Sequence, residues 1–344
     1  MLYIKNAALC FSSEIEDSSG LLVEDRKINK IVRSDRYKPP AGADTLDLKG
    51  YLLAPGFIDV HLQGAGGADC LDGNASAMDI ISHALPRSGV TSFLATTVFK
   101  KESNQHIGHI AEAMKRPAKA NILGIHLEGP FINPHKKGMI KPDGIMKANA
   151  GNLGRVFKEC RGALRMMTIA PEMPGALALI RRLKGEGVIA AIGHTDASYA
   201  AAQLGITAGI SHTTHIFNAM RSLHHREPGP LAAVLLDKNV SVQLISDGIH
   251  IHPAVIKMVY RLKGVDGITL ITDSMASLGL PDGRYVYDGR EYESRAGVCT
   301  YKDGTLIGTS LPLNKMARRM MEYSGATLLE VLRMITLNPA RVLG

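Results

Sequence analysis

The chain has 344 residues, of which 45% are hydrophobic and 21% charged, with a formal net charge of +8. This composition is typical of a soluble globular protein and excludes a largely disordered or collagen-like chain. The four cysteines are widely spaced and form no CxxC pair, which disfavours a cysteine-type zinc site and a disulfide framework. We therefore expect reduced thiols and a cytoplasmic location. Apolar runs fall far below the ~18 residues of a membrane span, and basic tracts are short, so neither a membrane nor nucleic acid is an expected partner.

The pattern of the first 53 residues predicts short strands separated by turns, and we assign these residues to a small β domain. From residue 57 a different pattern begins, in which short apolar, β-branched runs alternate with helix-like segments. The eight runs are Phe57–Leu62, Thr91–Val98, Ile122–Leu127, Arg165–Ala170, Val188–Ile192, Ile210–His215, Val240–Ile245 and Ile268–Thr272. Such alternation is typical of a buried parallel sheet, and eight units favour a closed (β/α)8 barrel over residues 54–284.

A doubly wound open sheet is the alternative, but the segment after the first strand, Gly64–Gly67, lacks the GxGxxG spacing of that fold. Residues 285–309 contain two Asp-Gly pairs between strand-type residues, which predicts hairpins. Helix-like segments within 310–337 are expected to extend the barrel. Residues 338–344 are predicted to begin a return to the small β domain.

Polar residues follow most of the predicted barrel strands, at the end where such barrels carry their chemistry. These strand-end residues are His61, Gln63, His126, Glu128, His194, His212, His215, Asp247, His250 and Asp273. A single histidine after a strand is more commonly a structural residue. A structural role does not easily explain why polar residues follow six different strands. By contrast, His83, His106 and His109 lie on predicted helices and are expected at the surface.

One glutamate and two histidines at separate strand ends suit a divalent metal and leave a coordination position for water. Glu128, His194 and His215 are the candidate ligands, and Asp273 is the candidate base. The neighbouring His126 and His212 are ambiguous, since each either lines the site or supports it from behind.

The motif that opens the barrel resembles the amidohydrolase superfamily, and six further motifs in order resemble, within it, the deacetylases of 6-phosphorylated N-acetyl amino sugars. The barrel opens with Pro55–His61, and the other motifs are His126–Phe131, Gly193–Ala197, Thr214–Met220, Arg226–Gly229, Asp247–His250 and Thr272–Asp273. The resemblance implies a TIM-like barrel of the metal-dependent amidohydrolase type, with a small β-sandwich domain formed by the two termini.

The resemblance also implies an activity and roles for residues. The expected reaction is hydrolysis of the N-acetyl group of N-acetylglucosamine 6-phosphate, giving glucosamine 6-phosphate and acetate. By position, Glu128, His194 and His215 match the metal ligands, with zinc preferred and iron, cobalt or manganese also suitable. Asp273 matches the catalytic acid/base. The residues that match phosphate-side contacts are Asn218, Ala219 and His250, with Arg226 reaching the site from the other subunit of a homodimer.

The chain departs from its relatives in three places. The first strand ends His61-Leu-Gln63, where many relatives have His-x-His, and glutamine is a poor zinc ligand; we expect one metal ion, with His61 helping to stabilise the oxyanion and Gln63 supporting the site. Ile140 replaces a histidine of the relatives, which makes N-acetylgalactosamine 6-phosphate an alternative substrate. The chain also stops before a final strand that relatives usually carry.

Two other functional hypotheses remain open. A dihydroorotase-like or dipeptidase-like enzyme is the nearest rival, but many of those use a carboxylated lysine after the fourth strand, and Met166–Pro171 contains none. A non-catalytic sugar-phosphate-binding barrel is the more distant rival, and the intact metal-type residues argue against it.

Overall fold

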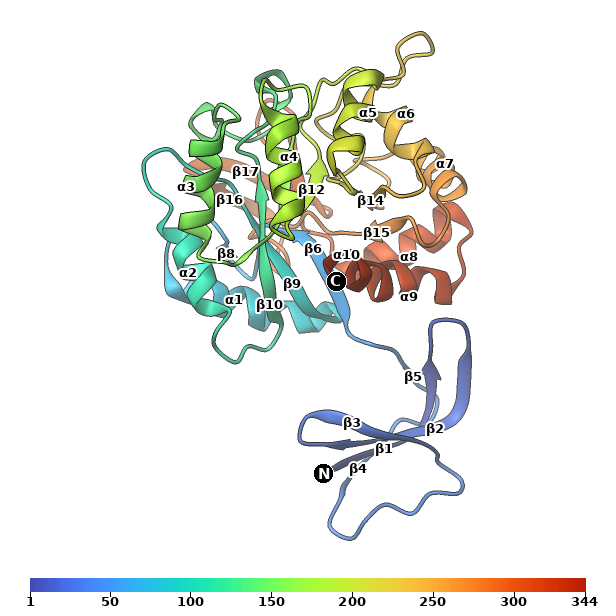
Figure 1. The fold of residues 1–344 in the computed structure, drawn as a ribbon. Coiled ribbons are helices and arrows are strands. Elements are labelled where there is room, and N and C mark those ends of the chain that lie inside the picture. The colour runs from blue at the N-terminus through green and yellow to red at the C-terminus, as the bar shows by residue number, and fades with distance from the viewer.

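The computed structural model describes all 344 residues and contains a parallel eight-stranded sheet that curves into a nearly closed barrel (Figure 1). Its strands follow in chain order: β6 (Phe57–Leu62), β9 (Val90–Thr97), β10 (Asn121–Glu128), β11 (Leu164–Ile169), β12 (Ile189–Ile192), β13 (His212–Thr213), β14 (Ser241–Leu244) and β15 (Ile268–Leu270). The predicted barrel is thereby confirmed.

The first and last barrel strands, β6 and β15, do not form a hydrogen-bonded ladder with each other. The chain just beyond β15 closes this seam instead. The backbone N–H of Asp273 donates to the carbonyl of His61 over 2.9 Å, and the hydroxyl of Thr272 donates to Asp59 over 2.6 Å. Two residues proposed for the site therefore meet across the seam.

Helices cover the outside of the barrel (Figure 1). They are α1 (Ala75–Ala84), α2 (Gln105–Ala113), α3 (Ala150–Cys160), α4 (Ala176–Gly185), α5 (Tyr199–Ala208), α6 (Gly229–Leu236), α7 (Pro253–Lys263), α8 (Leu313–Ser324) and α9 (Leu328–Ile335). One core of 70 buried residues joins these helices to the strands. None of the helices is long and apolar enough to cross a membrane.

The N-terminal residues form a separate five-stranded sheet, which Figure 1 shows apart from the barrel. Its strands are β1 (Leu2–Cys10), β2 (Ile15–Glu24), β3 (Lys27–Arg33), β4 (Asp44–Asp47) and β5 (Leu52–Leu53). All of them come from the N-terminal part of the chain, so the sandwich built from both termini stays a prediction. Several large apolar side chains of this sheet are exposed, among them Ile28, Ile31 and Tyr51.

Residues 338–344, from which we expected the start of a return to the small domain, lie almost entirely in helix α10 (Leu337–Leu343) beside the barrel, and the return itself stays a prediction. The buried side chain of Asn338 explains this placement. Its amide nitrogen donates to the carbonyls of Val265 and Ile268, each over 2.7 Å, and so anchors the helix to the start of β15.

The predicted hairpins form a four-stranded antiparallel sheet of β16 (Gly283–Tyr287), β17 (Arg290–Arg295), β18 (Val298–Thr300) and β19 (Leu306–Thr309). Asp288 and Gly289 make the first turn, both with positive φ (49° and 73°), as a two-residue hairpin requires. An isolated bridge between Thr309 and Ser274 ties β19 to the segment after β15. This small sheet therefore packs against the end of the barrel where the strand-end residues lie.

Candidate active site

A cavity of about 310 Å³ lies at the carboxyl ends of the barrel strands. Eight of the predicted site residues line it: Gln63, Glu128, His194, His215, Asn218, Ala219, His250 and Asp273. Residues from six barrel strands and the loops that follow them therefore face one space, which is the arrangement that function at this end of a barrel requires.

The three proposed ligands converge on one point. Glu128 Oε1 lies 2.9 Å from His194 Nε2 and 2.8 Å from His215 Nε2, and the two imidazole nitrogens are 3.2 Å apart. All three side chains are nearly fully buried. Burial would raise the pKa of Glu128, but the charge and hydrogen bond of His194, followed by those of its neighbours, hold the pKa well below its ordinary value.

The hydrogen bond from His194 to the backbone indicates whether the three proposed ligands can bind a metal. Its Nδ1 faces the carbonyl of Lys136 over 2.7 Å, and since a carbonyl can only accept, Nδ1 carries a proton. In the neutral ring Nε2 then presents a lone pair toward Glu128 and His215. This lone pair and the carboxylate of Glu128 repel each other unless a cation lies between them, and one carboxylate with two imidazoles suits zinc and related ions. The residues therefore fit a divalent metal.

A second group overlaps with this one. His61, Glu128 and His215 offer ligand atoms that all lie within 4.8 Å of one another. His61 is fully buried, its Nε2 lies 3.8 Å from Glu128 Oε1, and Asp273 Oδ1 is 3.2 Å away from the same nitrogen. The geometry places His61 beside the proposed ligands, where it could also contact the ion.

His61 and Asp273 form a buried charge pair in the protein without metal. Burial opposes the charge on His61, yet Asp273 first and Glu128 next raise its pKa to about 9. Burial would raise the pKa of Asp273 too, but the adjacent His61 outweighs it, so this pKa is lowered. Asp273 is thus held as the carboxylate, the form that can accept a proton.

Four proposed site residues have left-handed backbone conformations, which non-glycine residues seldom adopt: φ is 48° at His194, 24° at His215, 51° at Ala219 and 49° at Asp273. Such conformations cost of the order of 1–3 kcal/mol each and persist only where the surroundings determine them. Hydrogen bonds on both sides hold Asp273, since its N–H donates to His61 and its carbonyl accepts from Thr309.

The residues proposed to contact phosphate, Asn218, Ala219 and His250, line the same cavity. The Nδ1 of His250 is 2.6 Å from Asp247 Oδ2, and both side chains are buried. This contact orients the His250 ring within the cavity lining. Asn218 and Ala219 lie three and four residues after His215, and Ala219 (φ 51°) turns the backbone there.

Some predicted residues lie outside the cavity. Arg226 is on an exposed loop, with Nη1 2.8 Å from His225 Nε2, and does not line the site of its own chain. His126 is inside the barrel, where its Nε2 lies 2.9 Å from the hydroxyl of Thr168. His212 is also buried, and its Nδ1 is 2.6 Å from the hydroxyl of Ser241.

Sequence reasoning missed several residues near the site. The side chains or backbone of His135, Lys136, Met139 and the segment 305–308 line the cavity. Residues 305–308, in the β18–β19 segment, lie more than thirty residues beyond Asp273, so no strand-end rule could have found them. Ile140, at the position where we expected relatives to carry a histidine, is buried against Val98 and Ile132 and is absent from the cavity lining.

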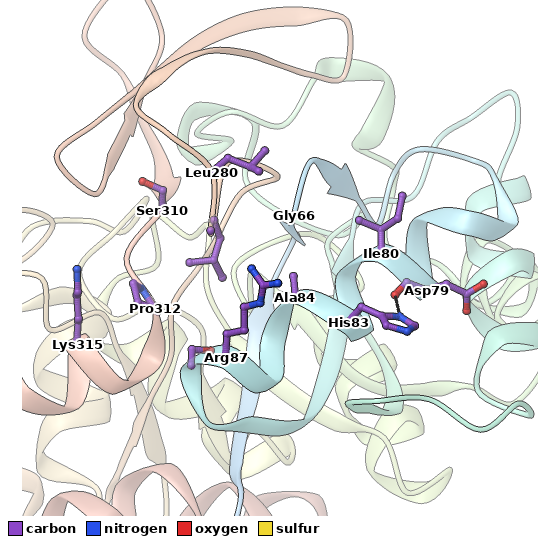
Figure 2. Close-up of a pocket in the computed structure, with 13 residues that line it drawn as sticks. Gly66, Asp79, Ile80, His83, Ala84, Arg87, Leu280, Ser310, Pro312 and Lys315 are labelled. Carbon is purple, nitrogen blue, oxygen red and sulfur yellow. Dashed lines mark hydrogen bonds between the residues drawn. The ribbon is translucent and has the colours of Figure 1, made fainter.

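A larger cavity of about 710 Å³ lies elsewhere, between α1 and the start of α8 (Figure 2). Arg87 and Lys315 border it, together with apolar side chains such as Ile80 and Leu280. It contains none of the predicted site residues. The smaller strand-end cavity is the better candidate because the buried ionisable groups converge there.

Comparison with known proteins agrees with this geometry. Residues 52–344 match the amidohydrolase family, and the chain belongs to that family. A Bacillus subtilis (strain 168) protein named N-acetylglucosamine-6-phosphate deacetylase is 36% identical over 354 residues, covering 100% of this chain and 88% of the relative. An Escherichia coli O157:H7 protein named N-acetylgalactosamine-6-phosphate deacetylase is 37% identical over 296 residues, covering 85% and 78%.

Two solved structures extend the comparison. An N-acetylglucosamine-6-phosphate deacetylase from Pasteurella multocida superposes with a TM-score of 0.91 at 28% identity, covering 100% of this chain and 90% of that one. A point mutant of the Mycobacterium smegmatis enzyme, in complex with N-acetyl-D-glucosamine-6-phosphate, gives 0.89 at 30% identity, with the same coverage.

Proposed function

We propose that this chain is a metal-dependent hydrolase that removes the N-acetyl group of N-acetylglucosamine 6-phosphate, giving glucosamine 6-phosphate and acetate in amino-sugar catabolism. The observation that carries the proposal is the convergence of Glu128, His194 and His215 in one cavity with Asp273. The deacetylase relatives, which match the whole chain, support the same reaction.

Glu128, His194 and His215 would hold one divalent ion, with zinc preferred and iron, cobalt or manganese also compatible with these ligands. When bound, such an ion lowers the pKa of water from 15.7 to about 7 and polarises the oxygen of a carbonyl. Gln63 Nε2 lies 3.4 Å from Glu128 Oε2, so its amide supports the carboxylate from the side.

Asp273 performs the proton transfers in this proposal. As the carboxylate it accepts a proton from the attacking water while the new C–O bond forms at the amide carbon. It then returns that proton to the amine nitrogen as the C–N bond breaks. His61, 3.2 Å from Asp273, stabilises negative charge in the same part of the site.

The phosphate of the substrate would lie in the cavity near Asn218, Ala219 and His250. Arg226 has no place in the cavity of its own chain, and its exposed loop supports the proposal that it reaches the site of a second subunit in a homodimer. The four buried, unpaired cysteines support a reducing, cytoplasmic location.

The direct test measures acetate release and metal content on one purified sample. We expect release from the phosphorylated sugar, loss of activity with a chelator, and recovery with zinc or manganese. Asp273→Asn should retain metal and lower kcat by about 10²–10⁴, while Asp79→Asn, on the exposed surface, should match the wild type. Near-normal turnover by Asp273→Asn would remove this residue from the mechanism.

N-acetylgalactosamine 6-phosphate is the alternative substrate, because one relative of comparable identity carries that name. Parallel kcat/KM measurements on the two epimers decide between them. A higher value for the galacto epimer would replace the preferred substrate without changing the reaction.

A further inference from the structure

A glutamine sits in the middle of a barrel strand, behind the proposed catalytic groups. Gln243, on β14, is fully buried. A buried amide is costly unless it is hydrogen-bonded. Its Oε1 lies 3.0 Å from His61 Nδ1 and accepts the backbone N–H of His215 over 3.2 Å. One oxygen atom therefore contacts two residues of the site, His61 on β6 and His215 just after β13.

The backbone contact fixes which end of the Gln243 amide faces the site. A backbone N–H can only donate, so the atom opposite His215 must be the oxygen. The amide nitrogen then points to Met166 Sδ, 3.4 Å away. Because the oxygen can only accept, His61 Nδ1 must carry a proton. The other nitrogen, Nε2, is thereby directed toward Asp273 and Glu128.

We propose that Gln243 is a positioning residue, which keeps a proton on His61 Nδ1 and holds Nε2 toward Asp273. The same oxygen holds the backbone at His215, whose left-handed conformation aims its ring at Glu128. This inference rests on the proposed function for its kinetic consequence, but the placement of the proton is a property of the folded protein alone.

The experiment separates this role from simple packing. Gln243→Met keeps the size of the side chain and removes the acceptor, whereas Gln243→Glu keeps an oxygen in its place. Met166→Leu is the matched control, since it removes only the partner of the amide nitrogen. The zinc-loaded proteins, with ¹⁵N-labelled histidine, are examined by NMR for the His61 Nδ1–H resonance, and kcat and KM are measured on the same samples.

We expect a protected Nδ1–H in the wild type, in Met166→Leu and in Gln243→Glu, and its loss from Gln243→Met. In Gln243→Met, kcat should also fall by about 10–100-fold with little change in KM, as for other residues that orient a metal-site histidine. A wild-type His61 without a proton on Nδ1 overturns the proposal, and so does a protected Nδ1–H in Gln243→Met, whatever the activity.

If Gln243→Met fails to fold, the spectra of the wild type and of Gln243→Glu still test the inference. An unprotonated His61 Nδ1 in either protein overturns it. The spectra need no substrate. A protein that shows the expected Nδ1–H but releases no acetate would therefore contradict the proposed function and leave this inference standing.

Discussion

The hydroxyl of Thr272 donates to Asp59 Oδ2 over 2.6 Å, and this bond joins the two strands between which the barrel ladder is interrupted. The other carboxylate oxygen of Asp59 accepts the backbone N–H of His61 over 3.2 Å. Burial raises the pKa of Asp59 to about 6, although the bonds from Thr272 and His61 oppose this rise. A single buried carboxylate thus sets the spacing between His61 and Asp273.

Thr272→Val should weaken this seam. The variant keeps the shape of the side chain but leaves Asp59 Oδ2 without its donor, which costs about 1–3 kcal/mol of unfolding free energy. We also expect kcat to fall, since Asp273 is the next residue. Urea unfolding and steady-state kinetics measure the two effects.

Thr269→Val provides the matched control. Thr269 is also buried in the barrel, but its hydroxyl has no hydrogen-bond partner, so its removal should be neutral or stabilising. Equal losses in the two variants would show that the bond to Asp59 has no special role.

Arg226→Ala should raise KM for the phosphorylated sugar far more than for the unphosphorylated sugar, because an arginine binds phosphate through a bidentate pair of hydrogen bonds. Arg284→Ala, an exposed arginine on the hairpin sheet, controls for the loss of positive charge. Equal effects on the two substrates would argue against the phosphate role, and sedimentation of the wild type tests for the dimer.

The burial of His106 predicts that the protein loses stability in acid. It is 5% exposed, contrary to the surface position expected from the sequence, and it faces the carbonyl of Val98. Burial lowers its pKa to about 4, from an ordinary value of 6.5. Between these values the unfolded chain binds a proton that the folded chain does not, so stability is complete above pH 6.5 and falls as the pH drops toward 4.

His106→Gln removes this titration and keeps a donor for Val98. The unfolding free energy of the variant should therefore decline less between pH 6.5 and 4, by about 1.4 kcal/mol for each unit of pKa depression. Urea unfolding across this range, with His109→Gln as the control on the same helix, makes the measurement. Parallel curves for wild type and His106→Gln would contradict the assignment.

The sequence was sufficient for the barrel because its strands are apolar and its helices separate them regularly. It was also sufficient to bring Glu128, His194 and His215 together, since all parallel strands end at one edge. It could not predict that Asn338 would anchor a terminal helix to β15, because that contact depends on two carbonyls some seventy residues away.

Gln243 shows a second limit of the sequence. It lies inside an apolar run and ahead of the strand end, so a rule that looks for polar residues after strands passes over it. Only the folded barrel reveals that its side chain contacts His61 and the backbone of His215. The same holds for the β18–β19 segment, which reaches the cavity through tertiary packing alone.

The left-handed backbone at Asp273 implies a conflict between stability and activity. Its φ of 49° is easy for glycine but costs other residues about 1–2 kcal/mol. Asp273→Gly should therefore be inactive yet more stable than the equally inactive Asp273→Ala, by about 1 kcal/mol in urea unfolding. Selection for folding stability alone would favour glycine at this position. An aspartate there is therefore explained by the activity of the protein and not by its stability.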